Sequence, residues 1–246
     1  MPVPVIPADP TWPTVAAADR TAAPYDPAAD ARTELDRQIR SALDLGLAAV
    51  LGWTPERLHD AVAPLRAALD GPQPVPGPDA SGRVVPADDH VPFVLVLDGG
   101  ADHANAAVPA LRHGSRTVRP GVSVIDAEEM ATYRPLPDLD VPTGPYLLRD
   151  VDTGTEFCGV RPEDALVTVR GRGRTPLTIG EGLALAALRP DMLRPNRCFS
   201  LMGSRAQNQR VPALWLSERR PKLGWCWDRN PHTWLGAASA GGRLAA

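Results

Sequence analysis

The chain has 246 residues, 43% of them hydrophobic, and a formal net charge of -3, which is enough to bury one sizeable core. No apolar run reaches the roughly 18 residues that a membrane span requires. The 3 cysteines are an odd count without paired short spacings, which argues against a disulfide framework. The amino-terminal residues have neither a basic region nor a continuous apolar run, so they do not resemble a signal peptide. We therefore expect a cytoplasmic protein.

The amino-terminal part predicts a tail followed by two helices. Residues 1–28 are rich in proline, alanine and aspartate and hold too little apolar bulk to offset the entropy of ordering, so we expect a disordered tail. Residues 29–71 predict a helical hairpin. In its second helix Thr54 can serve as the N-cap and Pro55 as the first residue, and Pro64 predicts a kink. The apolar stripe of the first helix is formed by Leu35, Ile39, Leu43, Leu47 and Val50.

This hairpin admits two interpretations. The pair of helices can dock or dimerise, which gives the hypotheses of a homo-oligomer and of a scaffold or adaptor protein. It can also be a DNA-reading helix-turn-helix, but its charge is balanced or acidic where a recognition helix requires bases.

The remaining chain predicts a linker and then an α+β domain. Residues 72–88 are rich in proline and glycine and predict the linker, and residues 89–246 predict the domain. Thr178 and Glu181 have the spacing of a capping box at a helix start. Because strands and helices are segregated along the chain, we expect a mixed or antiparallel sheet with a few helices. The strand-like segments are residues 91–97, 121–125, 145–151, 156–160, 211–217 and 222–227, and the helical segments are residues 161–173 and 177–188.

Two short motifs are interpreted as loops. Residues 152–154 read Asp-Thr-Gly, the tripeptide of aspartic proteases, but Arg149 and Asp150 stand where a protease requires apolar residues, so a turn between two strands is favoured. Residues 97–106, "LDGGADHANA", follow a strand with a Gly-Gly turn. They lack the spacing of a phosphate-binding fingerprint, and Asp98 and Asp102 would repel phosphate.

The carboxyl-terminal region carries the candidate binding residues. Residues 197–243 hold 8 basic and 2 acidic residues, whereas residues 1–100 hold 7 basic and 14 acidic ones. Strand alternation over residues 222–227 predicts Trp225 and Trp227 on one face and Cys226 on the other. Tryptophan and arginine dominate recognition hot spots, so this face is either core or a binding surface. The predicted small-molecule or peptide site comprises Arg205, Arg210, Trp225, Trp227, Asn230 and His232.

Other chemistries use the cysteines of the same region. A hydrolase or transferase would need a thiolate from Cys226 or Cys198 beside the imidazole of His232. The same three residues are of types that bind zinc, although no Cys-x-x-Cys spacing supports a metal site. The identity of any cofactor is left open, with zinc as one candidate. Nucleic-acid binding is disfavoured because the chain is acidic overall.

Four stretches carry a resemblance to a known family. They are "YLLRDVDTGTEFCGVRPEDAL", "GRTPLTIGEGLAL", "NRCFSLMGSRAQNQRVPALWLS" and "PKLGWCWDRNPHTWLGAAS". Over residues 145–240 the chain resembles an uncharacterised actinobacterial family, a domain of unknown function. The resemblance implies a bacterial protein and transfers no activity, cofactor or catalytic residue.

Overall fold

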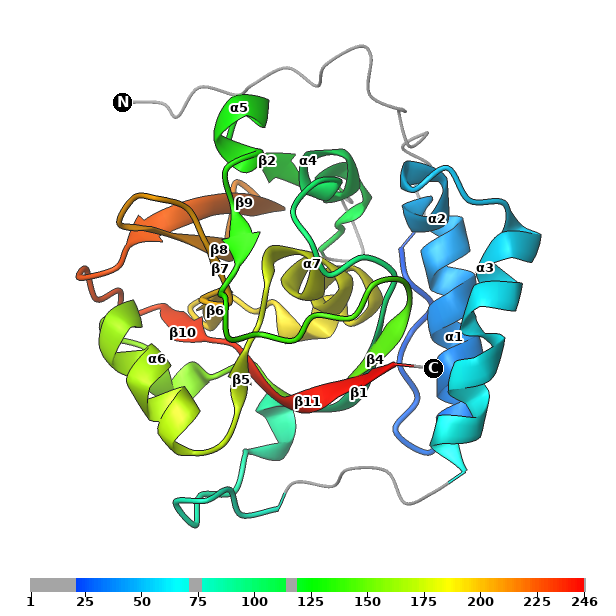
Figure 1. Cartoon of the computed structure of the whole chain (residues 1–246), viewed down its shortest axis with the longest axis horizontal. Coiled ribbons are helices and arrows are strands. Elements are labelled where there is room, and N and C mark those ends of the chain that lie inside the picture. The colour runs from blue at the N-terminus through cyan, green and yellow to red at the C-terminus, as the bar shows by residue number, and fades with distance from the viewer. Residues whose placement is uncertain (1–20, 71–76, 114–118, 246) are drawn as a thin grey trace.

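The structure is a computed structural model that describes residues 21–70, 77–113 and 119–245 (Figure 1). Residues 1–20 of the predicted tail lie outside the described residues. Residues 21–28, the remaining part of this segment, contact two arginines. Arg37 Nη1 donates a hydrogen bond to the carbonyl oxygen of Ala23 over 2.6 Å, and the Arg189 guanidinium lies 3.7 Å from the ring centroid of Tyr25. Both arginines are buried, so these contacts fix the chain before the first helix begins.

A four-stranded antiparallel sheet forms one layer, in the order β1-β4-β11-β5. Its strands are β1 (His90–Val96), β4 (Tyr146–Asp152), β11 (Ser239–Ala245) and β5 (Thr175–Pro176). Strand β4 is central and carries Leu147, Leu148 and Val151, which are fully buried. The apolar run that predicted this strand is therefore covered on both faces.

A five-stranded mixed sheet forms the second layer, in the order β10-β6-β8-β9-β2. Its strands are β10 (Leu235–Ala237), β6 (Cys198–Ser200), β8 (Arg210–Ser217), β9 (Arg220–Trp227) and β2 (Val122–Ser123). The β6-β8 and β8-β9 pairs are antiparallel, and the two outer pairs are parallel. A two-stranded sheet joins β3 (Arg134–Pro135) to β7 (Ser204–Arg205). The predicted α+β class with mixed and antiparallel sheets is confirmed.

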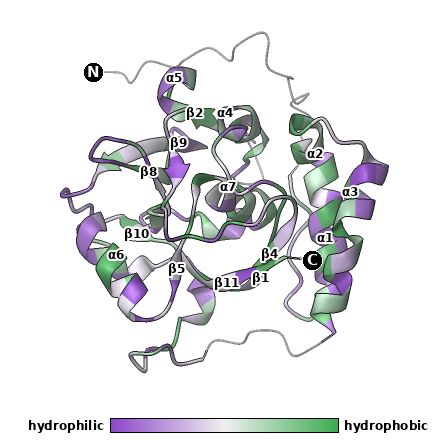
Figure 2. Cartoon of the chain, in the orientation of Figure 1, coloured by the Kyte–Doolittle hydropathy of each residue, from purple (hydrophilic) through white to green (hydrophobic). Residues whose placement is uncertain are grey.

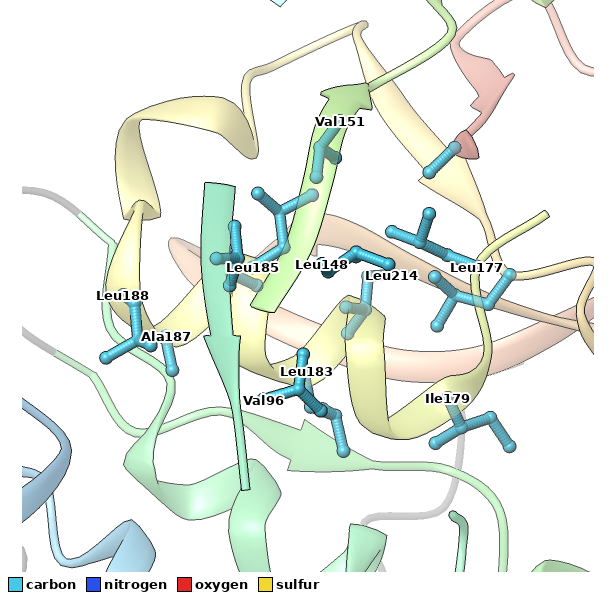
Figure 3. Packing of buried hydrophobic residues seen from close by; sticks show 14 of the residues in the cluster. Val96, Leu148, Val151, Leu177, Ile179, Leu183, Leu185, Ala187, Leu188 and Leu214 are labelled. Atoms are coloured by element: carbon cyan, nitrogen blue, oxygen red, sulfur yellow. The ribbon is translucent and has the colours of Figure 1, made fainter. Parts of the chain in front are cut away.

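Helix α7 (Ile179–Leu188) lies between the two sheets and contacts β1 and β8. Figure 3 shows its apolar side chains beside Leu148 of β4 and Leu214 of β8. The predicted capping box is present, with Thr178 and Glu181 each bonding the backbone of the other. Glu181 is fully buried and also accepts hydrogen bonds from Arg243 Nε and from Tyr146 Oη, over 2.6 and 2.7 Å. We name Glu181, Arg243 and Tyr146 the core cluster.

The hairpin helices pack against the sheets as an outer layer (Figure 1). They are α1 (Ala31–Asp44), α2 (Leu47–Val50), α3 (Pro55–Val62) and the 3-10 segment Ala63–Leu69. The first predicted helix is interrupted at Gly46, whose φ of 76° is left-handed, and the second becomes 3-10 beside Pro64. Figure 2 shows that these helices carry both hydrophilic and hydrophobic residues, as expected for amphipathic helices. Their apolar residues Leu35 and Leu58 lie in the same core as the sheet residues.

Helix α1 also covers the outer edge of strand β1. The Gln38 side chain donates a hydrogen bond to the carbonyl oxygen of Phe93 over 3.2 Å and accepts one from the backbone N–H of Leu95 over 2.7 Å. An edge strand with unpaired backbone groups is a template for pairing with another chain. Gln38 satisfies two of those groups, so this edge is closed by the protein itself.

Two expectations need correction and two stay predictions. Residues 156–160 were expected to form a strand, but residues Thr155–Phe157 form a 3-10 turn because Gly154 adopts a φ of 70° against the backbone of Ala237. The Asp-Thr-Gly segment therefore ends β4 at Asp152 and leads through Thr153 and Gly154 into this 3-10 turn, and it is not a hairpin between paired strands. The division into hairpin, linker and α+β domain stays a prediction, as does oligomerisation through the hairpin. Within the described residues, no helix has the length and hydropathy of a membrane span.

Candidate functional site

The candidate site is built on the hairpin of β8 and β9. Its turn places Glu218 and Arg219 at φ values of 54° and 61°, the left-handed conformation of a type I′ turn, whose twist matches that of paired strands. The resulting register sets Arg210 opposite Trp227 and Pro212 opposite Trp225. Residues directly opposite in an antiparallel pair share a face, so the arginine and both indoles lie on the same side of the sheet.

On that face the three side chains form a stack. The Arg210 guanidinium lies 3.9 Å from the ring centroid of Trp225 and 5.8 Å from that of Trp227. The two indole centroids are 5.1 Å apart, with the rings inclined at 67°. Trp227 is 46% exposed and Trp225 is half-buried. These tryptophans therefore form a surface, and the alternation expected over residues 222–227 agrees with the strand register.

A glutamate from helix α5 (Ala127–Met130) neutralises the arginine of this stack. Arg210 Nη1 lies 2.6 Å from Glu129 Oε2, and Tyr133 Oη donates a hydrogen bond to Glu129 Oε1 over 3.2 Å. Burial and the adjacent Glu129 carboxylate raise the pKa of Tyr133 above its ordinary value, so the phenol remains a donor. The sequence did not predict Glu129 and Tyr133 as site residues, because they lie about 80 residues before Arg210 in the chain.

The other predicted arginine is also paired. Arg205 Nη2 lies 3.1 Å from Asp228 Oδ1, directly after the end of β9. Both arginines of the predicted site thus face a carboxylate. The site offers aromatic faces and neutralised guanidinium groups, and not bare positive charge for an anionic ligand.

Strand β9 presents backbone groups at its outer edge beside these indoles. Strand β2 pairs with β9 only at Lys222 and Leu223, and the Val124 N–H donates to the Leu223 carbonyl over 2.8 Å. Because backbone groups alternate direction along a strand, Trp225 and Trp227 point theirs to the same side as Leu223. Beyond β2, the described residues place no strand against this edge, and the Trp227 carbonyl accepts the N–H of Asn230 over 3.0 Å. The N–H and C=O of Trp225 and the N–H of Trp227 form what we name the open edge.

Asn230 and His232 belong to a second group of side chains. The His232 ring lies 5.2 Å from the ring of Trp234, which is 6.4 Å from that of Trp215. Asn230 and His232 line a small pocket of about 210 Å³ together with Ser200. The six predicted binding residues therefore divide between the stack at the end of β9 and this pocket.

Neither candidate cysteine has the properties of a catalytic thiolate. Cys226 is 6% exposed, and burial raises the pKa of its thiol to about 12. Cys198 is 2% exposed, and burial raises the pKa of its thiol as well.

The strand register also separates the two cysteines. Cys226 is paired with Val211 of β8, whereas the β6 pairing that sets Phe199 opposite Leu214 places Cys198 level with Trp215. These positions are four residues apart along β8, or about 13 Å. Among the described residues, which include Cys198, Cys226 and His232, no group of three His, Cys, Asp or Glu side chains could hold a metal ion.

Fold and site together define a mixed α+β protein that displays an arginine-tryptophan stack beside an open strand edge. The chain belongs to a family of unknown function, DUF5701, whose model matches residues 41–246. The match thus begins within the hairpin and extends well beyond the residues 145–240 that carried the resemblance. Comparison with curated proteins and with solved structures gives no significant match.

Proposed function

We propose that this protein binds an extended peptide segment as an added strand along the open edge of β9. Two features coincide at Trp225 and Trp227 and carry the proposal. The described residues place no strand against their backbone groups, and one of the two indoles is exposed while the other is half-buried. In strand addition, main-chain hydrogen bonds supply affinity and neighbouring side chains supply specificity. Tryptophan and arginine are the residue types that most often carry binding energy at such surfaces.

The charges around the stack define the class of peptide. Arg210 is paired with Glu129 and Arg205 with Asp228, so an acidic peptide would have to displace a carboxylate. The exposed face of Trp227 instead suits an aromatic, proline or cationic side chain, the last through a cation-π contact. The expected ligand is a neutral or basic extended segment with such a side chain opposite Trp227.

The shape of the surface favours a peptide over a small molecule. Small-molecule sites are concave and bury most of their ligand, whereas Trp227 lies open at the end of a strand with 46% of its surface exposed. An extended chain gains contacts along the strand direction, so it does not need an enclosing cavity.

Selection from a display library of linear peptides, followed by affinity measurement by fluorescence anisotropy, tests the proposal. We expect Trp227→Ala to weaken the selected peptides at least about tenfold, the usual loss at a hot spot. Trp53→Ala is the matched control, because Trp53 also stacks with an arginine, Arg57, at 4.9 Å. Peptides N-methylated at the bonding amides should lose binding as well.

Two results would contradict the proposal. In one, selection yields no peptide that binds the wild-type protein more tightly than Trp227→Ala. In the other, N-methylated and unmodified peptides bind equally well, which would show that no strand is added.

A further inference from the structure

A second concave site lies between the hairpin helices and the α+β elements, away from the residues that sequence reasoning selected. It is a pocket with about 60 Å³ of enclosed space, or about 550 Å³ when the part open to solvent is counted. Helices α1 and α2, the end of β1, α4 (Ala104–Ala107) and α7 all contribute to its wall. Ligand sites prefer such junctions between structural units. The "LDGGADHANA" stretch, interpreted above as a plain loop, forms part of this wall.

The wall is apolar except at two side chains. Alkyl groups line it from every contributing element, including Leu47 and Leu51 of the hairpin region and Leu183 of α7. Among the lining residues only Asp98 and His103 carry polar side chains. An apolar chamber with few polar groups binds an apolar body and orients it by its polar end.

Asp98 is held firmly in place. Its Oδ1 accepts a hydrogen bond from the Gly100 N–H over 2.9 Å, and Thr178 Oγ1 donates to the Gly99 carbonyl over 2.7 Å. A Cβ at Gly180 would lie 2.3 Å from the Asp98 carbonyl oxygen, so the loop rests directly on the start of α7. A carboxylate fixed in this way loses little entropy when it binds a ligand.

We infer that this pocket binds a small molecule with an alkyl or aromatic body and a protonated amine directed at Asp98. Among the described residues that line the pocket none is an arginine or a lysine, and Asp98 is the acidic side chain of its wall. A carboxylate beside an apolar wall selects a cation and repels another carboxylate, because the low local dielectric strengthens both interactions. The half-buried side chains of Leu47, Leu51 and Ala184 leave the chamber accessible from solvent.

The test compares three ligands with the same chain length, n-decylamine, n-decanol and n-decanoate, by displacement of the fluorescent N-phenyl-1-naphthylamine below the micellar concentrations. The wild-type protein should bind decylamine at least about tenfold more tightly than decanoate, the range of one charge-assisted hydrogen bond. Asp98→Asn should remove this preference and leave decanol binding within about twofold of the wild type.

Filling the chamber gives the second half of the test. Ala184→Phe should abolish binding of all three ligands, whereas Ala49→Phe, on the exposed side of α2 and outside the pocket, should not. Leu51→Trp, at a half-buried position, gives an independent block if Ala184→Phe lowers the melting temperature. The inference is overturned if the ligands do not displace the dye, if both blocking variants still bind, or if decanoate binds as tightly as decylamine. Trp227→Ala should leave these affinities unchanged, so this outcome is independent of peptide binding.

Discussion

Two clusters in this molecule use the same residue types, a glutamate, an arginine and a tyrosine. Both tyrosines are buried, but the two glutamate–arginine pairs differ in exposure. In the core cluster Glu181 is completely buried and receives two hydrogen bonds from Arg243, one from Tyr146 and one from the Thr178 N–H. The surface cluster comprises Glu129, Arg210 and Tyr133. In it Glu129 pairs with Arg210 over 2.6 Å, and the side chains of Glu129 and Arg210 are 17% and 31% exposed. Every oxygen in the first cluster is satisfied internally, whereas the arginine of the second lies against indoles that face solvent.

The difference separates a structural from a functional use of the same chemistry. A buried charge must have its hydrogen bonds completed within the protein, because leaving one unmet costs the full desolvation free energy. The Glu129–Arg210 pair is partly exposed, so water can complete the hydrogen bonds that the protein does not supply. The core cluster therefore fixes α7 between the sheets, and the surface cluster can exchange partners.

The largest difference is expected between Glu181→Gln and Glu129→Gln. Glu181→Gln leaves the Arg243 charge buried without its counterion and should lower the free energy of unfolding by about 3–5 kcal/mol. Glu129→Gln should lower it by about 1 kcal/mol or less, because both partners reach solvent. Urea denaturation followed by circular dichroism measures both values. Equal losses would show that burial does not distinguish the two clusters.

High pH should destabilise the protein through groups that stay protonated only when folded. Burial raises the pKa of Cys226 to about 12 from the ordinary 9.0. The native state therefore binds more protons than the unfolded chain between about pH 9 and 12, and the free energy of unfolding falls as pH rises through this window. Tyr146 and Tyr133, whose pKa values are also raised, act in the same direction above pH 10.

Substituting Cys226 measures how much its thiol contributes to the loss of stability at high pH. Cys226→Ala should make the slope of unfolding free energy against pH shallower by up to about 1.4 kcal/mol per pH unit between pH 9 and 11. Alkylation by iodoacetamide at pH 7.5 should label Cys226 only after unfolding. Rapid labelling of the folded protein would contradict the raised pKa and revive the thiol enzyme hypothesis.

Substituting the tyrosine should also lower the free energy of unfolding more in the core cluster than in the surface cluster. The difference should be smaller than the one between the two glutamate variants. Tyr146→Phe removes a hydrogen bond to a buried carboxylate and should cost about 1.5–3 kcal/mol. Tyr133→Phe removes a longer bond of 3.2 Å to a partly exposed one and should cost about 0.5–1 kcal/mol. Thermal and urea unfolding of the two variants, each compared with the wild type, check the order.

Raising the salt concentration should change the free energy of unfolding least of all. It should alter the contribution of the surface cluster alone. In 0.5 M NaCl the difference in stability between wild type and Glu129→Gln should vanish, because exposed charges are screened. The loss caused by Glu181→Gln should persist, since the buried pair excludes mobile ions. A salt-dependent loss at Glu181 would show that water reaches the core cluster.

Local sequence patterns predicted the elements of both clusters but not the contacts between them. The capping box at Thr178 and Glu181 could be predicted because it depends on three-residue spacing. The bonds of Glu181 to Tyr146 and Arg243 span 35 and 62 positions and arise only when β4 and β11 pair. Sequence alternation likewise predicted Trp225 and Trp227 on one face. The turn that aligns Arg210 with them could not be predicted, because Glu218 and Arg219 are not of the asparagine, aspartate or glycine types that favour a type I′ turn.

The apolar pocket was missed for a related reason. Its wall residues come from five elements, and the apolar ones satisfy the ordinary pattern of a core-facing position. Whether alkyl groups from separate elements meet or leave a space between them depends on the distance between those elements, which no single pattern contains. Asp98 was considered only as an obstacle to phosphate, because the apolar wall beside it was unknown.

The outer edge of β1 and the edge of β9 beyond the short strand β2 differ, and this difference has a consequence at high protein concentration. Gln38 occupies the backbone groups of Phe93 and Leu95, whereas the described residues place no strand beside Trp225, so this edge can meet the same edge of a second molecule. Two such edges are related by a two-fold axis when they pair antiparallel. Self-association and peptide binding would then compete by mass action. In a dilute solution a smaller fraction of the protein would be self-associated, so a larger fraction would be available to bind peptide.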